Sequence, residues 1–373
     1  MTREFSGSDM SLSPFIVIWE VTQACDLSCV HCRADAQSWR NITELSTEEA
    51  YSLISDIKQF GNPVFVLTGG DPLKRDDIFD IVEHSVGKGL RTTMSPSVTP
   101  LLTRESIKKL KESGLSRIAI SLDGSVHELH DSFRGINGAF DATMEAISTC
   151  NEIELPLQIN TTVSKYNLED IDNIATLIEG FSPVLWSVFF LVPTGRGKRG
   201  DSITAKEYEK VFEKMYEYSL TMPYDIKSTE APHYRRYVLE KNLDNARSNG
   251  QANGISGGDI ENYIGRSPMA INDGKGFVFI SHTGEVFPSG FLPISCGNVR
   301  KRSIVDIYRN SRVFNKIRDY KLLKGKCGVC EFKYICGGSR ARSFSITGDY
   351  MESEPYCAYI PERYKELVGQ NIG

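Results

Sequence analysis

Three cysteines lie within eight residues near the start of the chain, at Cys25, Cys29 and Cys32. They directly follow the apolar run 15–21, with three residues between the first pair and two between the second. Thiolates spaced this closely on one loop are typical ligands of an iron–sulfur cluster. Because a [4Fe–4S] cluster has four irons, three ligands leave one iron open, as in a catalytic metal site. The alternative is a zinc knuckle with a fourth ligand from His31 or elsewhere, but zinc motifs usually contain paired C-x2-C units.

A second group of cysteines lies near the C-terminus and comprises Cys327, Cys330, Cys336 and Cys357. Four thiolates suffice for one fully ligated [4Fe–4S] cluster, and a structural zinc ion is the alternative. The total of nine cysteines is odd and the chain is long, so metal ligands are favoured over disulfide bonds. Cys150 lies on an apolar helix face and is expected in the core, whereas Cys296 is either a buried thiol or a substitute ligand.

The spacing C-x3-C-x2-C after a first strand resembles the signature of the radical S-adenosylmethionine (radical SAM) enzymes. This resemblance implies that the open iron binds the methionine end of SAM, and that reductive cleavage of SAM yields a 5′-deoxyadenosyl radical. The family usually has an aromatic residue just before the third cysteine, and His31 offers a planar ring at that place.

Further motifs resemble those with which this family binds SAM. The string GGDP at 69–72 resembles the GGEP motif, whose backbone groups receive the amine of SAM, and SLDG at 121–124 resembles the ribose-binding S-x-D-G. Arg134 resembles the arginine that pairs with the SAM carboxylate. We therefore expect SAM contacts from this set: His31, Gly69, Gly70, Asp71, Ser95, Ser121, Asp123, Arg134 and Asn160.

Plainer interpretations of these residues stay open at this point. GGDP alone is a common turn, and Arg134 could be a surface arginine. Ser95, Asn160 and Thr162 lie at or near the ends of expected strands and could be structural caps. The string GRGKRG at 195–200 lacks the GK[ST] of a P-loop, so it is either a substrate-facing loop or a solvated connection.

The C-terminal group, with its C-x2-C-x5-C spacing and the CGGxRA string at 336–341, resembles the SPASM extension of radical SAM maturases. Full SPASM domains carry seven cysteines and hold two auxiliary clusters. Ser289 and Ser339 stand where such domains often have cysteine. The resemblance therefore implies one auxiliary [4Fe–4S] cluster, held by the four cysteines of this group.

Six strand–helix units follow one another in the first part of the chain, which predicts an α/β fold with a parallel sheet. The expected strands are 15–21, 63–68, 90–95, 117–122, 155–163 and 184–192. Among the helix starts, Ser46 to Glu49 forms a capping box, and Thr103 and Asn167 can cap later helices. Periodicity does not separate a doubly wound sheet from a barrel, but the family resemblance implies a partial (β/α)6 TIM barrel. Sites in barrel-like folds lie at the carboxyl ends of the strands.

The chain is expected to divide into four parts: a lead-in at 1–14, the radical SAM core at 15–222, a linker at 223–270, and the auxiliary cluster domain at 271–373. Within the linker, 241–265 is rich in Asn and Gly and predicts a mobile loop. In the last part, 276–280 and 285–287 predict a β-hairpin, followed by short helices near 303–319.

Composition narrows the location and the partners of the protein. The chain has 373 residues and a net charge of −5 without a basic block, which disfavours nucleic acid. No apolar run approaches the roughly 20 residues that span a bilayer, so no membrane association is expected. The polar N-terminus lacks a secretory signal, which predicts a cytoplasmic metalloenzyme.

Two substrate classes remain open. The first is a tetrapyrrole, because the chain resembles radical SAM enzymes of alternative haem and haem d1 synthesis, and because 229–236 (TEAPHYRR) clusters cations with an aromatic ring that could bind carboxylates. The plainer interpretation of that segment is a helix start with solvated arginines. The second is a ribosomally made peptide, although only about 14 residues precede the first strand, too few for a peptide-binding domain. A non-enzymatic iron–sulfur relay would leave the SAM motifs unexplained. A reductant such as ferredoxin or flavodoxin is expected as a partner.

Overall fold

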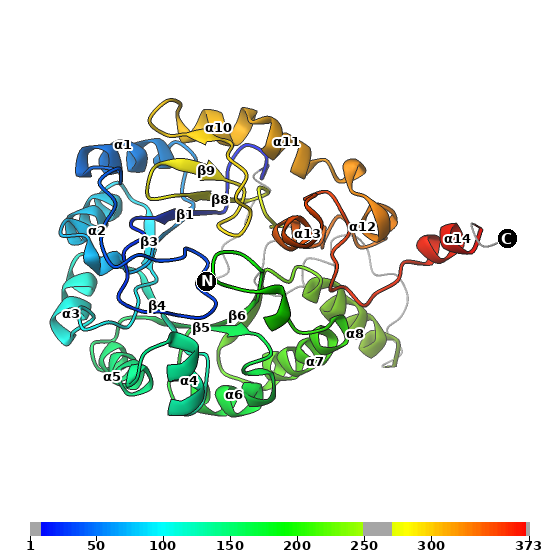
Figure 1. The fold of residues 1–373 in the computed structure, drawn as a ribbon, viewed down its shortest axis with the longest axis horizontal. Coiled ribbons are helices and arrows are strands. Elements are labelled where there is room, and N and C mark those ends of the chain that lie inside the picture. The colour runs from blue at the N-terminus through cyan, green and yellow to red at the C-terminus, as the bar shows by residue number, and fades with distance from the viewer. Residues whose placement is uncertain (1–8, 249–270, 371–373) are drawn as a thin grey trace.

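The computed structural model describes residues 9–248 and 271–370, and its main element is one ten-stranded sheet with helices along its outer face (Figure 1). Seven consecutive strands are parallel: β1 (Ile16–Glu20), β2 (Val64–Thr68), β3 (Arg91–Met94), β4 (Arg117–Ser121), β5 (Leu157–Val163), β6 (Leu185–Phe190) and β7 (Asp225–Thr229). The sheet order is β10-β9-β8-β1-β2-β3-β4-β5-β6-β7, so the curved sheet stays open between β7 and β10. The expected partial barrel is confirmed.

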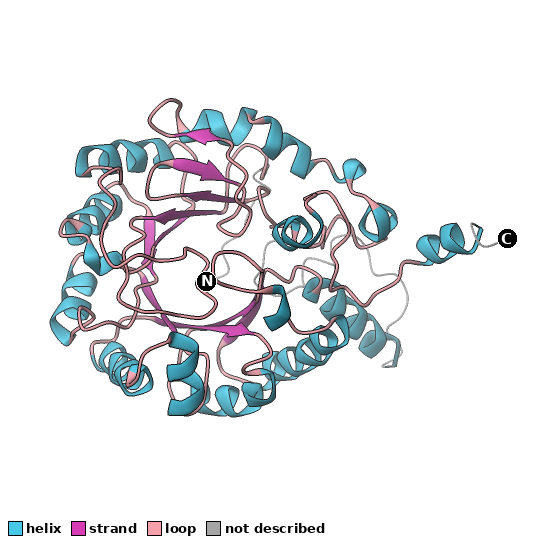
Figure 2. Ribbon diagram, viewed as in Figure 1, coloured by secondary structure: helices cyan, strands magenta, loops and turns pink. Residues whose placement is uncertain are grey.

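Helices alternate with these strands and cover the convex side of the sheet (Figure 2). They are α1 (Thr47–Lys58), α2 (Ile78–Gly87), α3 (Arg104–Glu112), α4 (His127–Arg134), α5 (Ala139–Glu152), α6 (Ile171–Glu179), α7 (Ala205–Thr221) and α8 (Tyr234–Ser248). The capping boxes expected at Ser46 and Thr103 are both formed. Asn167 does not cap the following helix; its side-chain amide instead donates to the carbonyls of Asp123 and Thr162, each at 3.0 Å.

The expected linker at 223–270 is wrong in its first half. β7 and α8 both fall in this range and continue the strand–helix alternation, because β7 pairs in parallel with β6 from Leu185 opposite Asp225. The expected loop at 241–265 begins inside α8, which runs to Ser248, and the rest of it lies outside the described residues.

The C-terminal region joins the same sheet. The expected hairpin is formed by β8 (Phe277–Ile280) and β9 (Glu285–Phe287), followed by β10 (Gly297–Asn298). β8 also pairs in parallel with β1, with Ile16 opposite Phe277, which the sequence did not indicate. Short helices then lead to the C-terminus: α10 (Ile304–Asn310), α11 (Arg312–Arg318), α12 (Gly325–Val329), α13 (Arg340–Thr347) and α14 (Glu362–Gln370).

Alternation along the strands separates an apolar outer face from a polar inner face. Ile120, Ile159 and Val188 belong to the main hydrophobic core, which also contains the inward faces of the helices. The neighbouring positions point the other way, into the concave lumen of the barrel. Strand register aligns four of them in one row, namely Ser121, Asn160, Ser187 and Lys227. No helix among the described residues is long and apolar enough to cross a membrane.

Candidate active site

The three N-terminal cysteines lie close together on the loop that follows β1. Their side chains form one small cluster with Leu27 and Ala36. Each sulfur accepts one N–H hydrogen bond: Cys25 from Leu27 N (3.4 Å), Cys32 from Ala36 N (3.5 Å) and Cys29 from Arg134 Nη1 (3.8 Å). Burial raises the pKa of the Cys25 and Cys29 thiols, so their thiolate forms require a positive partner such as iron. This donor set fits an iron–sulfur cluster.

Two glycines after β2, Gly69 and Gly70, pack closely against the backbone that leads into the cysteine loop. Gly70 N donates to Thr22 O (2.8 Å), and Asp71 N donates to Ala24 O (2.6 Å). A Cβ atom would lie 2.5 Å from Thr22 O at Gly69, and 2.4 Å from Ala24 O at Gly70. Glycine is therefore required here by the approach of the cysteine loop itself, and the backbone N–H groups of Gly70 and Asp71 are used within the protein.

The Asp71 side chain faces the protein interior. Its Oδ2 accepts a hydrogen bond from Thr99 Oγ1 (2.7 Å), and its Oδ1 accepts one from Leu73 N (3.2 Å), which caps a short 3-10 helix. Burial raises the pKa of Asp71 to about 6. The carboxylate thus holds the turn that carries Gly69 and Gly70.

Asp123 and Arg134 form an ion pair with each other at the end of β4 and α4. Asp123 Oδ1 also accepts a hydrogen bond from Thr162 N (2.6 Å), and both side chains are largely buried. We expected Asp123 at the ribose and Arg134 at the carboxylate of SAM, and the two side chains lie in direct contact with each other. The His31 ring stacks on Phe133, with centroids 4.2 Å apart, and burial lowers its pKa well below the usual range.

The remaining predicted contacts lie on the lumen side of the strands. Ser121 and Asn160 are partly exposed neighbours in the row described above, and Gln158 donates to Asn160 Oδ1 (2.7 Å). Ser95 directly follows β3 and is partly exposed. The structure therefore brings the predicted SAM-contact positions to the side of the barrel where β1 to β4 end, with Asn160 level with Ser121 and Arg134 contributed by the end of α4.

Three residues near the cysteines were missed as site residues. Ser97 Oγ donates to Gly70 O (2.7 Å) and accepts from Cys25 Sγ (3.3 Å), so it joins two of the motifs. Arg196 donates from its backbone N to Cys32 O and from Nε to Cys29 O, both at 2.9 Å. Gly195 has φ +58° and would place a Cβ 2.3 Å from Cys32 O. The GRGKRG string is therefore a support for the cysteine loop, a function that neither of its two sequence interpretations included.

The four C-terminal cysteines line one pocket, as their spacing predicts. Two sulfurs accept backbone hydrogen bonds, Cys336 from Gly338 N and Cys327 from Glu354 N, both at 3.3 Å. Burial raises the pKa of Cys330 to about 11 and that of Cys357 to about 12. Four partly buried sulfurs, two of which accept backbone N–H hydrogen bonds, fit a closed metal cluster.

The other two cysteines are not near this pocket. Cys150 is fully buried on α5, as expected. Cys296 packs in the main core, and its thiol donates to Ile294 O (3.5 Å). Of the two interpretations of Cys296, the structure supports the buried thiol.

Ser289 and Ser339 share one partner, the side chain of Glu230. Ser289 Oγ donates to Glu230 Oε1 (3.2 Å), and Ser339 Oγ donates to Glu230 Oε2 (2.9 Å). Glu230 follows β7 with φ +60°, an uncommon conformation for a non-glycine residue, and burial raises its pKa to about 8. Two serine hydroxyls that donate to one buried carboxyl group thus stand where SPASM domains often have cysteines.

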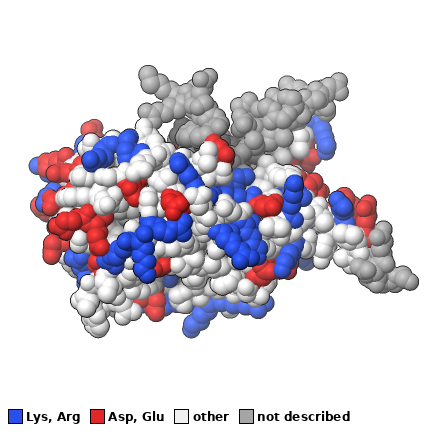
Figure 3. All heavy atoms as spheres, turned by 90° about the horizontal axis from the view of Figure 1, so that it is seen from above, with Lys and Arg blue, Asp and Glu red and all other residues white. Residues whose placement is uncertain are grey.

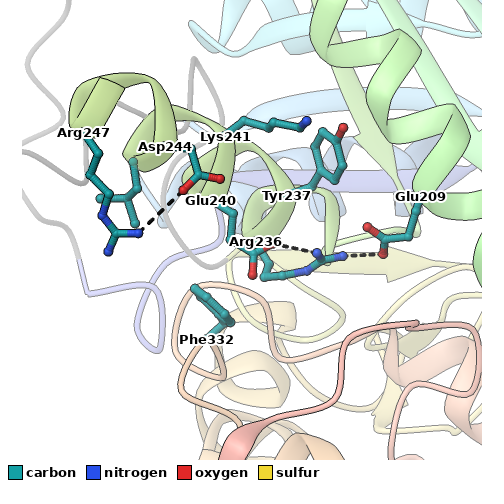
Figure 4. A pocket seen from close by; sticks show the side chains of 9 residues that line it. Glu209, Arg236, Tyr237, Glu240, Lys241, Asp244, Arg247 and Phe332 are labelled. Atoms are coloured by element: carbon teal, nitrogen blue, oxygen red, sulfur yellow. Dashed lines mark hydrogen bonds and ion pairs between the residues drawn. The ribbon is translucent and has the colours of Figure 1, made fainter. Parts of the chain in front are cut away.

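The segment 229–236 does not form the expected exposed carboxylate-binding group, and its arginines are not solvated either. Arg235 donates to the carbonyls of Ile335 (3.1 Å) and Ile271 (2.6 Å), which ties α8 to the C-terminal region. Arg236 pairs with Glu209 and Glu240 in a pocket beside α8 (Figure 4). Acidic and basic side chains balance in this pocket, so it offers no net positive site.

Comparison with known proteins agrees with this geometry. The family model of the radical SAM superfamily matches residues 19–178, and that of the SPASM iron–sulfur cluster-binding domain matches residues 272–331. An AdoMet-dependent heme synthase of Methanosarcina barkeri is 41% identical, covering 94% of this chain and 98% of that protein. This chain belongs to the radical SAM superfamily.

More distant relatives match most of this chain, in sequence or in fold. A PqqA peptide cyclase of Bradyrhizobium diazoefficiens is 27% identical over 93% of this chain and 87% of its own. The crystal structure of Streptococcus suis SuiB bound to S-adenosylmethionine has a TM-score of 0.73 at 16% identity, covering 93% of this chain and 78% of that chain. The radical SAM protein described here is thus an enzyme that uses SAM at a [4Fe–4S] cluster, and its SPASM region binds an auxiliary iron–sulfur cluster.

Proposed function

We propose that this enzyme acts on an iron porphyrinoid and removes propionate carboxyl groups or side chains from it during haem biosynthesis. The observation that carries this proposal is the sequence identity of 41% to an AdoMet-dependent heme synthase over 94% of this chain. The identity to the peptide cyclase is 27%. A ribosomally made peptide is the second candidate, and the similarity to that cyclase supports it.

We assign the cofactor ligands from the two cysteine groups. Cys25, Cys29 and Cys32 would hold the catalytic cluster, and the set Cys327, Cys330, Cys336 and Cys357 would hold one auxiliary cluster. When bound, SAM and the catalytic cluster supply a radical that abstracts hydrogen from the substrate. The protein positions the partners of that step: Asp123 would accept hydrogen bonds from the ribose hydroxyls, and Arg134 beside it would bind the carboxylate of SAM.

The lumen of the barrel provides a cation for a substrate carboxylate. Lys227 lies in the row of Asn160 and Ser187, on the inner face of β7. Among the described residues it has no hydrogen bond or ion pair, and burial together with the charge of Arg117 lowers its pKa to about 8. A half-buried ammonium group without a counter-ion carries a desolvation cost, and a carboxylate would offset that cost. We therefore propose that Lys227 binds a propionate group of the substrate.

An external one-electron donor of the ferredoxin or flavodoxin class would reduce the enzyme. Support comes from residues 300–326, which contain ten Lys or Arg and only two Asp in a chain of net charge −5. Figure 3 shows many Lys and Arg side chains, interspersed with Asp and Glu, on the face that carries α10 and α11. Such a surface favours an acidic protein partner by electrostatic steering. Reduction by flavodoxin should slow at high salt, whereas reduction by dithionite should not.

The proposed function is tested by anaerobic incubation of the reconstituted, reduced enzyme with SAM and iron-coproporphyrin. Mass spectrometry follows 5′-deoxyadenosine and the porphyrin together. We expect deoxyadenosine formation that depends on the porphyrin, with loss of carboxyl mass from it. Slow deoxyadenosine formation with intact porphyrin would contradict the tetrapyrrole substrate and favour a peptide.

A further inference from the structure

His233 occupies an unusual position beside the four C-terminal cysteines. It precedes α8 and is fully buried. Its ring packs against Tyr208 and Phe212, with centroid distances of 5.3 and 4.9 Å. It also lines the pocket that the four cysteine side chains share. His233 is therefore a neighbour of the proposed cluster ligands in this pocket.

Both ring nitrogens of His233 lack a hydrogen-bond partner among the described residues, although neither reaches solvent. A neutral imidazole always carries one N–H donor, and leaving such a group buried and unpaired costs about 1–3 kcal/mol. A phenylalanine would fill the same aromatic site without that cost. The nitrogen atoms therefore need a partner that belongs in the pocket.

Sulfur is the acceptor that this pocket is built to contain. The four cysteines can satisfy all four irons of a [4Fe–4S] cluster, so no iron position is left for an imidazole. An imidazole ring carries at least one N–H in either protonation state, so His233 can donate a hydrogen bond to such a sulfur. Hydrogen bonds to cluster sulfurs are one of the main determinants of reduction potential.

We propose that His233 donates an N–H hydrogen bond to a sulfur of the auxiliary cluster and raises the reduction potential of that cluster. The donor stabilises the reduced state because that state places more negative charge on the sulfurs. This inference rests on the proposed ligation of the cluster by the four cysteines. His233 is a positioning and tuning residue, and it does not itself bind iron or substrate.

The test uses the full-length chain with Cys25, Cys29 and Cys32 replaced by serine, so that only the auxiliary cluster gives an EPR signal. His233→Phe should lower the midpoint potential in a redox titration by about 59 mV, which corresponds to a tenfold change for a one-electron couple. His233→Gln, which retains an N–H donor, should lie closer to the wild-type value. His84→Phe removes another histidine with an unpartnered nitrogen, on α2, and should leave the potential unchanged.

An unchanged potential in His233→Phe, or equal shifts in His233→Phe and His233→Gln, would overturn the inference. Labelling with 15N-histidine decides the matter even where a variant fails to hold its cluster. We expect a weak 15N coupling to the reduced wild-type cluster. No coupling, or the strong coupling of a direct Fe–N bond, would contradict it. A chain without any auxiliary signal would instead refute the assignment of the four cysteines.

Discussion

The two cysteine groups of this chain differ in where the residues that support them come from. The first group lies on one eight-residue loop, and Ser97, Gly135 and Arg196, from distant parts of the barrel, contact its backbone or sulfurs. The second group spans residues 327–357, and most of the residues that line its pocket come from the same C-terminal segment, with His233 added from the barrel. A loop held from outside keeps one side free for a ligand, whereas a segment that wraps around a site closes it. The first arrangement suits catalysis and the second suits electron transfer.

The largest expected difference is between the effect of replacing one cysteine of the first group and the effect of replacing one of the second. Cys29→Ser should leave no deoxyadenosine above background with dithionite as reductant, because the site that binds SAM is lost. Cys336→Ser should retain SAM cleavage within about tenfold, since it disturbs that site only indirectly, but should abolish substrate conversion. Assay of both products under anaerobic conditions checks this. Wild-type deoxyadenosine rates in Cys29→Ser would contradict the ligand assignment.

The next effect concerns the outside support of the first loop. Gly70→Ala places a Cβ 2.4 Å from Ala24 O, so the loop must move. We expect the free energy of unfolding to fall by about 3 kcal/mol or more. We also expect the variant to bind less iron. Gly87→Ala, at the end of α2 where a Cβ meets no neighbouring atom, is the matched control and should stabilise by about 0.5–1 kcal/mol. Denaturant unfolding and iron analysis would show the contrast, and equal stabilities would refute the argument from close approach.

A smaller effect is expected for the ion pair at the SAM site. Asp123→Asn removes a buried charge beside Arg134, and the dissociation constant of SAM should rise about tenfold to hundredfold. The exposed pair of Arg104 and Glu152 is the control, since Glu152→Gln should change little. Equilibrium binding of SAM to the reconstituted enzyme measures both. An unaltered affinity of Asp123→Asn for SAM would contradict the proposal that Asp123 contacts SAM.

The smallest expected effect concerns the lumen cation and its pH dependence. The pKa of Lys227 is lowered to about 8, so its ammonium form, and with it the affinity for iron-coproporphyrin, should be lost as the pH rises through about 8. Lys227→Met should weaken binding about tenfold at pH 7 and remove this pH dependence. Lys108→Met, on the exposed surface of α3, should do neither. Absorbance titration of the porphyrin checks the result; a flat pH profile in the wild type would contradict the assignment.

Much of this architecture could be predicted because its signals are local. The first six strands and the capping boxes at Ser46 and Thr103 follow from short-range patterns, and the two cysteine groups follow from spacing. Strand β7 was missed because its sequence, Asp225–Thr229, is polar on the lumen side and has no continuous apolar run. Its identity depends on pairing with β6, which is a long-range interaction.

The site was predicted in its positions but less well in its contacts. Asp71 and Arg134 were expected to face SAM, and both also bind partners within the protein. Arg196 and Ser97 were missed because their partners are a carbonyl and a thiol distant in sequence. Spacing indicates which residues are near the cluster. It does not indicate which backbone groups need support, because that depends on the tertiary approach of loops.

The pairing of β8 with β1 has a consequence for how the protein is made. The first strand of the chain emerges early from the ribosome, but the strand that covers its second edge, Phe277–Ile280, is translated only in the last third of synthesis. An uncovered, apolar strand edge invites pairing with other chains. Nascent chains that stop after α8 would therefore be prone to aggregate, and chaperone binding during translation should persist until the C-terminal hairpin has been delivered.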